Sequence, residues 1–494
     1  MNPRRASGQP ERLTFNWGAS AGGRVPRAAD TQTYGREAPA APIPAETGNG
    51  STRAAVRREP RDWAFTWMLL FTAALFLRPQ DLIPPLQILH LPEVTAIAGL
   101  ASLFSSRLRR RQPLTRMTPD LMGVILLGAI ILLTAPFSVW PGGSVRLFIE
   151  TYSKVILIYL LAVNVISSPR RLERFTWILV LAVSYVALLA VLDYVRGTNM
   201  IGHGTRVRGA VGGVLGNPND LALNMVSFLP LAAFIAMRSG SIARRIVAAG
   251  CVLLMVVTIV ATQSRGGFLG FIAMMVVLGA FAVRRRPAFV VVGALAALCA
   301  LPIVPGDYWL RLASITNENL DPNGSEAARR ELMKESFRAF VENPVTGVGA
   351  GQFVNWDPQR DQASHEAHDV LLQVASELGI TGLAVFVFLI GRAFLAVYQT
   401  RRLVREAKRR RDPSGPDSPI DEHSLQLLDA HSAAMAAALT GWTVCALFGS
   451  VAYSWTFYYL LLLAATPREM LRDALPHRTR AARRVPPALE VARA

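Results

Sequence analysis

Long apolar stretches recur along this chain from Trp63 onward, and they constrain its fold more than any other feature. Most are long enough, as helices, to cross about 30 Å of hydrocarbon. With 52% hydrophobic and 17% charged residues, the composition excludes a disordered chain and an ordinary soluble globule. The sequence therefore predicts an all-α, polytopic integral membrane protein with about twelve transmembrane helices. The expected spans are 63–79, 86–104, 119–136, 146–166, 174–195, 219–237, 246–262, 267–283, 288–305, 377–398, 431–451 and 453–467.

Two of these spans are irregular. Pro84, Pro85, His90 and Pro92 interrupt the start of the second span, which predicts a broken or partly interfacial helix. The last span is short, so we expect it to pair with its predecessor as a hairpin.

The net charge is +18, and the placement of the positive residues along the chain predicts the topology. No basic and aromatic face recurs, so a nucleic-acid partner is not indicated. Lys and Arg instead gather in alternate connections, as the positive-inside rule requires of cytoplasmic segments. Both termini are then cytoplasmic, and the other connections face the opposite side of the membrane, which is the periplasm if the cell is Gram-negative. The basic connections are 107–116, 169–174, 238–245, 284–286 and 401–411, and the opposite ones are 137–145, 196–218, 263–266 and 307–376.

The same pattern divides the chain into five parts. Residues 1–62 lack hydrophobic periodicity and are rich in Arg, Ala, Gly and Pro, which predicts a disordered basic cytoplasmic tail. The other parts are a membrane domain of nine spans at 63–306, a large helical periplasmic loop at 307–376, the last three spans at 377–467 with a charged cytoplasmic linker at 399–430, and a basic cytoplasmic tail at 468–494.

The first polar segment on the periplasmic face is RVRGAVGGVLGNPND, residues 206–220. Its Asn-Pro-Asn turn predicts a helix start, with Asn219 or Asp220 as the cap. A helix N-terminus beside Arg206 and Arg208 is suited to binding an anion. The alternative is a capped re-entry loop without a ligand.

The second segment is TQSRGG, residues 262–267, which joins two spans almost without a loop. An arginine at the end of a span usually reaches toward lipid head groups. Arg265, however, lies on the face where positive charge is avoided, with two glycines beside it. This placement favours a functional site.

The third segment, GSEAARRELMKESFRAF at 324–340, has the pattern of an amphipathic helix. Leu332, Phe337 and Phe340 suit a buried stripe or the membrane surface. Arg329 and Arg330 lie near the start, and one of them is a candidate for the pocket of Arg265. For a single arginine, a solvated helix face is the simpler alternative.

The fourth segment, residues 343–379, is the longest polar interval among the spans. Gly347, Gly349 and Gly351 predict a flexible or tightly turned run. His365 and His368 would share a helix face if the helix began early, but two histidines without carboxylates make a weak metal site. A neutral histidine is a natural general base near pH 7. A solvated loop without a site is the alternative.

These segments place several arginines and a histidine on one membrane face. Arginine stays charged and pairs bidentately with phosphate oxygens, so it is able to hold a diphosphate leaving group without a metal. The histidine is able to take a proton from an incoming hydroxyl. The combination indicates group transfer from a phosphate-linked lipid donor at the membrane surface.

The ordered motifs resemble those of the O-antigen ligase and O-antigen polymerase superfamily. The resemblance covers roughly residues 63–467, and the ordered set is fairly specific although each motif alone is weak. The matching pieces are GNPNDLA at 216–222, SRGG at 264–267, RRELM at 329–333, NPVTGVGAGQF at 343–353 and AHDVLLQVASELGITG at 367–382.

The resemblance implies a GT-C-like helical membrane glycosyltransferase of the bacterial inner membrane, acting without metal or other cofactor. The donor would be a polyprenyl-diphosphate-linked glycan such as an undecaprenyl diphosphate, transferred with inversion to a glycan or lipid A-core acceptor. Lipopolysaccharide or exopolysaccharide synthesis, and ligase or polymerase action, stay open. Membrane lipids and other polysaccharide-assembly proteins are the further partners expected.

Residue roles carry over by motif. Arg265 and Arg329 would bind the diphosphate, and His368 would activate or orient the acceptor hydroxyl. Asp369 stands where the family usually has Asn, which bears on how His368 is polarised. Met333 stands where many members have Trp, which leaves Arg329 and Arg330 as alternatives. The further candidates for substrate binding are Arg208, Arg206, Arg330, Asn219, Gly349 and His365.

Two other classes compete. A small-anion transporter, of the bicarbonate-carrying kind, would need ionisable residues deep in the membrane, and the sequence offers few, such as Glu150, Lys154 and Asp193. A noncatalytic assembly partner would tolerate loss of Arg265 and His368.

Overall fold

The computed structural model describes residues 62–202, 204–210, 216–283, 306–313, 325–356, 367–410 and 420–475. They form helices and one short antiparallel hairpin, in which β1 (Met200–Ile201) pairs with β2 (Arg206–Val207). The helices are α1 Trp63–Leu77, α2 Pro79–Leu82, α3 Leu91–Arg109, α4 Pro119–Thr134, α5 Pro141–Leu147, α6 Ser153–Val165, α7 Pro169–Arg196, α8 Pro218–Arg238, α9 Ile242–Thr262, α10 Arg265–Val283, α12 Gly306–Ala313, α13 Ser325–Glu342, α14 Val370–Arg410, α15 Glu422–Ala446 and α16 Trp455–Ala474. Short 3₁₀ turns lie at Pro84–Leu89, Ala135–Phe137 and Phe353–Asn355, and a π turn lies at Phe148–Tyr152.

The helical, membrane-spanning character of the chain is confirmed. Within the described residues, seven helices are long and apolar enough to cross a membrane. Two shorter apolar helices, α1 and α10, accompany them. Every expected span overlaps a helix except 288–305, which lies outside the described residues. The bounds of 431–451 were wrong, because α15 begins at Glu422 and ends at Ala446. The seven are Pro85–Arg109, Pro119–Phe137, Pro141–Val165, Pro169–Arg196, Pro218–Arg238, Ile242–Thr262 and Val370–Arg409.

The second expected span is broken at its start, as its prolines predict. A 3₁₀ turn ends at Leu89, His90 adopts a left-handed backbone (φ 42°), and α3 then begins at Leu91. Pro92 is tolerated because it occupies the first turn of α3, where the N–H has no helical partner.

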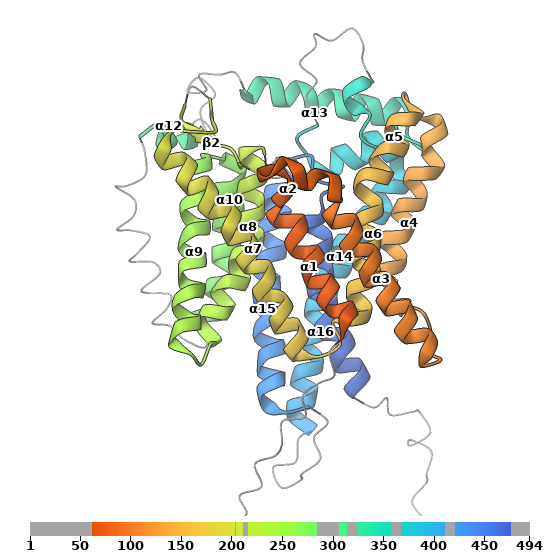
Figure 1. Ribbon diagram of the computed structural model, residues 1–494. Helices are drawn as coiled ribbons and strands as arrows, with labels where there is room; N and C mark the ends of the chain where they lie inside the picture. The colour runs from red at the N-terminus through yellow and green to blue at the C-terminus, as the bar shows by residue number, and fades with distance from the viewer. Residues whose placement is uncertain are drawn as a thin grey trace, which may run out of the picture. The chain divides into compact units, whose positions relative to one another are not determined.

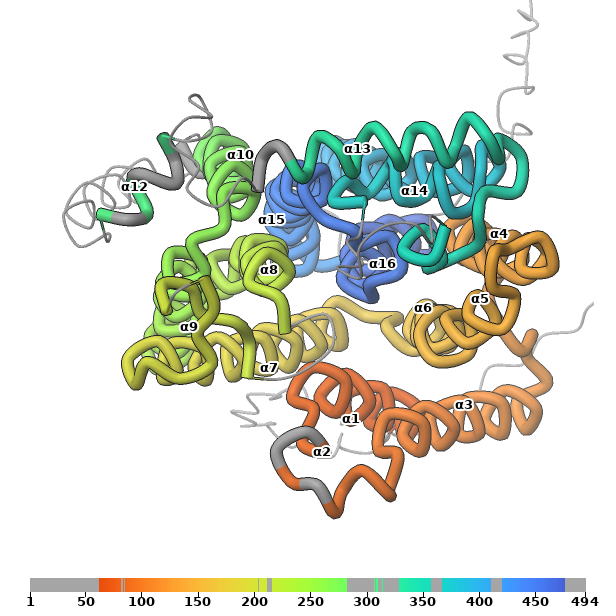
Figure 2. The backbone as a smooth tube through the Cα atoms, turned by 90° about the horizontal axis from the view of Figure 1, so that it is seen from above, coloured from red at the N-terminus to blue at the C-terminus, as the bar shows by residue number. Residues whose placement is uncertain are grey.

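Helix α16 lies in the middle of the bundle, with α14, α15, α8 and α6 around it (Figure 2). Every residue from Thr456 to Arg468 is buried. A helix that is apolar all round is expected in such a position. The short last span is therefore the most enclosed helix described, and it packs against α15 as well as α14.

A buried charge cluster ties three helices together. Asp120 of α4 accepts a hydrogen bond from Arg392 Nε of α14 (2.8 Å) and is ion-paired with Arg468 of α16. The side chains of Asp120 and Arg468 are both 0% exposed. Glu469 accepts from Arg468 Nε (2.7 Å). The sequence analysis named Glu150, Lys154 and Asp193 as examples of intramembrane charge and did not single out this cluster.

Helix α14 is broken near its start, at Gly379 (φ 65°, ψ −165°). An unbroken helix would pair the Ile380 N–H with the Ser376 carbonyl, four residues earlier. The break releases both groups. The Ile380 N–H donates to the Pro344 carbonyl (2.8 Å), and the Ser376 carbonyl accepts from the Val348 N–H (2.8 Å). The polar segment before α14 is therefore hydrogen-bonded into the kink.

Glycines make this docking possible. Gly347, Gly349 and Gly351 all have positive φ (67°, 104° and 69°). The Gly349 N–H donates to the Glu377 carbonyl (2.9 Å), and the Gly351 N–H donates to the Glu377 carboxylate (2.8 Å). A Cβ on Gly349 would overlap the hydroxyl of Ser138. Of the two forms expected for this run, the structure has the tightly turned one.

Helix α13 lies across one end of the bundle, and β2 is at the same end (Figure 1). Its inner side packs into a second, smaller core that is separate from the main one. This core contains Leu332 and Ala339 of α13, Val348 of the glycine run, Phe353, and Ala367 just before α14. The small core therefore joins the helix of Arg329 to the segment that carries His368.

Candidate functional site

Four separate segments of the chain line one pocket at the α13 end of the bundle. They are the start of α8, the turn between α9 and α10, the start of α13 and the end of α15 with its following turn. The lining residues are Asn219, Asp220, Leu223, Ser264, Gly266, Gly267, Arg329, Cys445, Phe448 and Gly449. Three of the four polar segments singled out in the sequence thus meet in space.

The turn between α9 and α10 is as short as the sequence indicates. Gln263 takes a left-handed backbone (φ 48°), and α10 begins two residues later at Arg265. The Ser264 hydroxyl accepts from the Gly267 N–H (3.1 Å) and donates to the Asn219 Oδ1 (2.9 Å). Ser264 therefore caps α10 and ties it to the start of α8.

Gly266 and Gly267 are needed because the start of α10 is closely packed. A Cβ on Gly266 would lie 2.8 Å from the Cβ of Phe448, and one on Gly267 would lie 2.6 Å from the Cβ of Ala222. Both distances are shorter than real carbon contacts. A larger residue at either position would displace α10 from the pocket wall.

Arg206 links the β hairpin to the end of α9 and the start of α8. Its Nε donates to the Thr262 carbonyl (3.0 Å), and its Nη2 donates to the Asn219 Oδ1 (2.9 Å). Arg208, in contrast, is exposed, and its backbone N–H donates to the Asn199 carbonyl (3.0 Å). Of the two arginines, Arg206 is the one that contacts pocket-lining residues.

The cap of α8 is neither of the residues expected from the sequence. Asn217 is the cap, and its side chain accepts from the Asn219 N–H (2.9 Å). Pro218 occupies the first helical position, which suits proline and places the cap one residue earlier. This leaves the Asn219 side chain to bind Arg206 and Ser264.

Two helix N-termini thus open on the pocket, from α8 and from α10. The positive end of each helix dipole lies at the pocket. Arg265 is the first residue of α10, between two pocket-lining residues, and it is only 7% exposed. Such a pocket is suited to an anion.

The structure distinguishes the two arginines at the start of α13. Arg329 is half-buried and lines the pocket, whereas Arg330 is exposed. Their side chains point apart because successive residues on a helix face different directions. Arg329 is therefore the arginine that joins the α8 and α10 termini.

A backbone hydrogen bond connects His368 to the residue that follows the pocket-lining Gly449. Its backbone N–H donates to the Ser450 hydroxyl (3.0 Å), and the neighbouring Gly449 lines the pocket. His368 has a left-handed backbone (φ 54°), and α14 begins only at Val370. The helical pairing considered for the two histidines is therefore wrong for His368, and His365 lies outside the described residues.

Asp369, which stands where the motif resemblance leads us to expect Asn, has the role of a helix cap. Its Oδ1 accepts from the N–H groups of Leu371 (2.8 Å) and Leu372 (2.9 Å), so it caps α14. Asn and Asp are equally good caps, which accounts for the exchange. Burial raises the pKa of the Asp369 carboxyl above its usual value, against these two hydrogen bonds.

Sequence reasoning missed the connection between α15 and α16. Gly449 and Ser450 lie within it, and the Ala452 N–H donates to the Gln373 Oε1 of α14 (3.1 Å). The available signal was the small polar break between two apolar stretches.

Gly349 was predicted to bind substrate, but the structure places it at the α14 kink.

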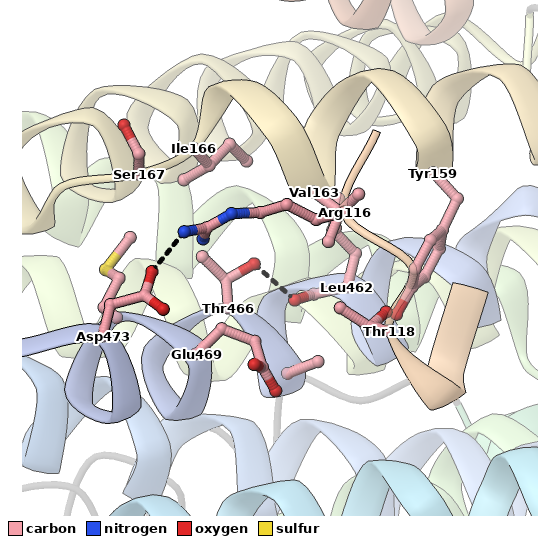
Figure 3. Close-up of a pocket in the computed structure, with 12 residues that line it drawn as sticks. Arg116, Thr118, Tyr159, Val163, Ile166, Ser167, Leu462, Thr466, Glu469 and Asp473 are labelled. Carbon is pink, nitrogen blue, oxygen red and sulfur yellow. Dashed lines mark hydrogen bonds and ion pairs between the residues drawn. The ribbon is translucent and has the colours of Figure 1, made fainter. Parts of the chain in front are cut away.

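A second pocket, at the other end of the bundle between α6 and α16, is a weaker candidate (Figure 3). Its arginine, Arg116, is ion-paired with Asp473 across the pocket (2.6 Å). The other lining groups include Glu469 and the hydroxyls of Thr118 and Thr466. Its two carboxylates, Glu469 and Asp473, outnumber its one arginine, which makes this pocket less suited to an anionic ligand than the first, where Asp220 is the one lining carboxylate.

The fold and the first pocket define a polytopic helical membrane protein with an anion-suited site at one end. Residues 250–387 match the family model described as O-antigen ligase. The match confirms the resemblance for this stretch, which holds the motifs at 264–267, 329–333, 343–353 and 367–382, and the matched family implies glycosyltransferase activity. The match includes α10, α13 and the α14 kink, but not Asn219 or Ser450. No curated protein matches the sequence.

Proposed function

We propose that this chain is a metal-independent, inverting glycosyltransferase that moves a polyprenyl-diphosphate-linked glycan to an acceptor hydroxyl. The observation that carries the proposal is the pocket where the N-termini of α8 and α10 meet Arg329. A diphosphate is a dense anion, and helix N-termini with a guanidinium hold it without a metal. Arg265, at the start of α10, is the second arginine assigned to the diphosphate.

His368 is assigned to the acceptor. In the reaction, the acceptor oxygen forms a bond to the anomeric carbon, and the bond from that carbon to the diphosphate oxygen breaks. The electron pair leaves with the diphosphate, whose charge the pocket stabilises. The acceptor proton passes to the His368 imidazole, which is a suitable base near neutral pH.

Topology completes the proposal. We assign about twelve spans in a GT-C-like arrangement, with both termini in the cytoplasm and the pocket on the periplasmic face of a bacterial inner membrane. The division into five parts and the role of 307–376 as the catalytic loop belong to the same assignment. Both a ligase, acting on a lipid A-core acceptor, and a polymerase, acting on glycan repeats, are compatible with it.

The test is transfer by the purified full-length chain in the presence of EDTA. It is given a polyprenyl-diphosphate oligosaccharide, with or without lipid A-core, and products are separated on a gel. Arg329→Ala and His368→Ala should abolish transfer, while Arg330→Ala, the matched control, should retain it. A ladder of repeats identifies a polymerase, and a single shifted acceptor band identifies a ligase. Folded protein without transfer, or with transfer independent of Arg329, would refute the proposal.

A further inference from the structure

The outward face of α13 carries an apolar stripe. Met333, Phe337 and Val341 are 41%, 57% and 58% exposed. Their four-residue spacing places them side by side along the helix. They lie apart from the inner side, where Leu332 and Ala339 are buried in the small core. The expectation that Leu332 and Phe337 share one stripe is therefore wrong.

A third side of α13 is charged. Lys334 pairs with Glu331 (3.4 Å), and Arg338 pairs with Glu342 (2.8 Å), all on exposed side chains. The helix thus presents one side to protein, one apolar side and one side suited to water. Helices that lie in a membrane interface have this division.

Further exposed apolar residues lie where the chain after α13 meets a membrane-crossing helix. Val345, three residues after the end of α13, is 62% exposed, and the adjoining Pro344 carbonyl accepts from the Ile380 N–H at the α14 kink (2.8 Å). Ile380 is 50% exposed, and Val387 further along α14 is 49% exposed. Helix α14 is long and apolar enough to cross the bilayer, so its exposed apolar side chains face lipid.

We infer that the Met333–Phe337–Val341 stripe of α13 is inserted into the lipid head-group layer at the pocket end of the protein. Three observations support lipid as the occupant. The chain just after α13 is hydrogen-bonded to α14 beside the exposed Ile380, α13 lies across the end of the bundle (Figure 1), and its charged side is adjacent to the stripe.

This placement has a consequence that depends on the proposed function. Arg329 lies on the same helix and lines the pocket. The bilayer would therefore hold Arg329 at head-group depth, where the diphosphate of a lipid-linked donor is located while its polyprenyl chain stays in the hydrocarbon. Lipid contact at α13 would then support donor binding.

The test measures depth. Phe337→Cys and Lys334→Cys are made separately in the full-length Cys299→Ser chain, whose other cysteines, Cys251 and Cys445, are buried. Each is labelled with the fluorophore NBD in vesicles of phosphatidylethanolamine and phosphatidylglycerol. Nitroxide lipids quench from the head-group or acyl region, and iodide quenches from water. The unmodified Cys299→Ser chain gives the labelling background.

We expect the label at position 337 to emit at shorter wavelength, to be quenched by shallow nitroxides and to resist iodide. The label at position 334 should show strong iodide quenching and weak lipid quenching. Equal iodide quenching at both positions would overturn the inference.

A second arm uses transfer activity. Phe337→Glu should raise the KM for the lipid-linked donor by roughly tenfold or more, as expected when one Phe loses its apolar environment. Phe337→Leu should leave the KM close to wild type. Shallow quenching without any transfer would support the placement of α13 and refute the proposed function. Strong iodide quenching at position 337 with normal transfer would refute the placement of α13 and support the proposed function.

Discussion

Replacing Ser450 with alanine should slow transfer without unfolding the protein. The Ser450 hydroxyl accepts the His368 N–H (3.0 Å), and His368 holds a left-handed backbone (φ 54°). That conformation costs a residue with a side chain about 1–2 kcal/mol, and a hydrogen bond of this kind contributes about 1 kcal/mol. Without the bond, the His368 backbone is free to relax to a more favourable conformation, and the imidazole leaves its position.

The expected loss in kcat is roughly 5–30-fold, corresponding to about 1–2 kcal/mol. The KM for the lipid-linked donor should stay near wild type, because the diphosphate pocket is formed by other segments. Ser450→Thr keeps a hydroxyl and should recover most of the rate. The assay is transfer under saturating donor, with thermal unfolding as the control for folding. If Ser450→Ala is folded and has wild-type kcat, the positioning of His368 by Ser450 is wrong.

Three further predictions concern stability, each measured by unfolding of the detergent-solubilised protein. Asp120→Asn should lower the unfolding free energy by about 3–5 kcal/mol, because it removes the buried carboxylate charge that Arg392 and the fully buried Arg468 share and leaves Arg468 with Glu469 alone; wild-type stability would contradict this. Gly349→Ala should lower the unfolding free energy by about 1–3 kcal/mol, because Gly349 has a φ of 104° and no space for a Cβ. In the control Gly391→Ala, the added Cβ meets nothing within 4 Å, so the unfolding free energy should not fall. Asp369→Asn should keep the helix cap and gain stability relative to wild type as the pH rises above the usual carboxyl pKa, because burial raises the Asp369 pKa and so penalises its ionised form; a pH-independent difference between the two would refute that reasoning.

Much of the fold followed from local patterns. Hydropathy located the helices, since a segment must be apolar over its whole length to cross the hydrocarbon. The tight turn before Arg265 and the amphipathic character of α13 were also readable, because both depend on residues within a few positions of each other. The proline-broken start of α3 belongs to the same class.

The features that escaped prediction depend on partners distant in sequence. Asp120 and Arg468 are 348 residues apart, and nothing near Asp120 indicates that two arginines will neutralise it. Ser450 binds His368 across 82 residues. A hydropathy pattern assigns residues to helices, but it does not determine which faces of those helices meet.

The candidate site was predictable to an intermediate degree. The order of the motifs predicted that the segments of Asn219, Arg265 and Arg329 form one site, and residues of all three segments line one pocket. The choice between Arg329 and Arg330 required the rotation of α13 about its axis. Periodicity alone does not fix that rotation, because the apolar residues of α13 cover both its protein-facing and its exposed apolar sides.

The central claim is that the pocket at the N-termini of α8 and α10 holds the donor diphosphate. The most direct measurement is an electron cryomicroscopy structure of the full-length chain in lipid nanodiscs with a polyprenyl-diphosphate oligosaccharide and EDTA. We predict phosphate density within hydrogen-bond distance of the Arg329 guanidinium and the Gly266 N–H. Diphosphate density elsewhere, such as in the pocket between α6 and α16, with this pocket empty, would contradict the account.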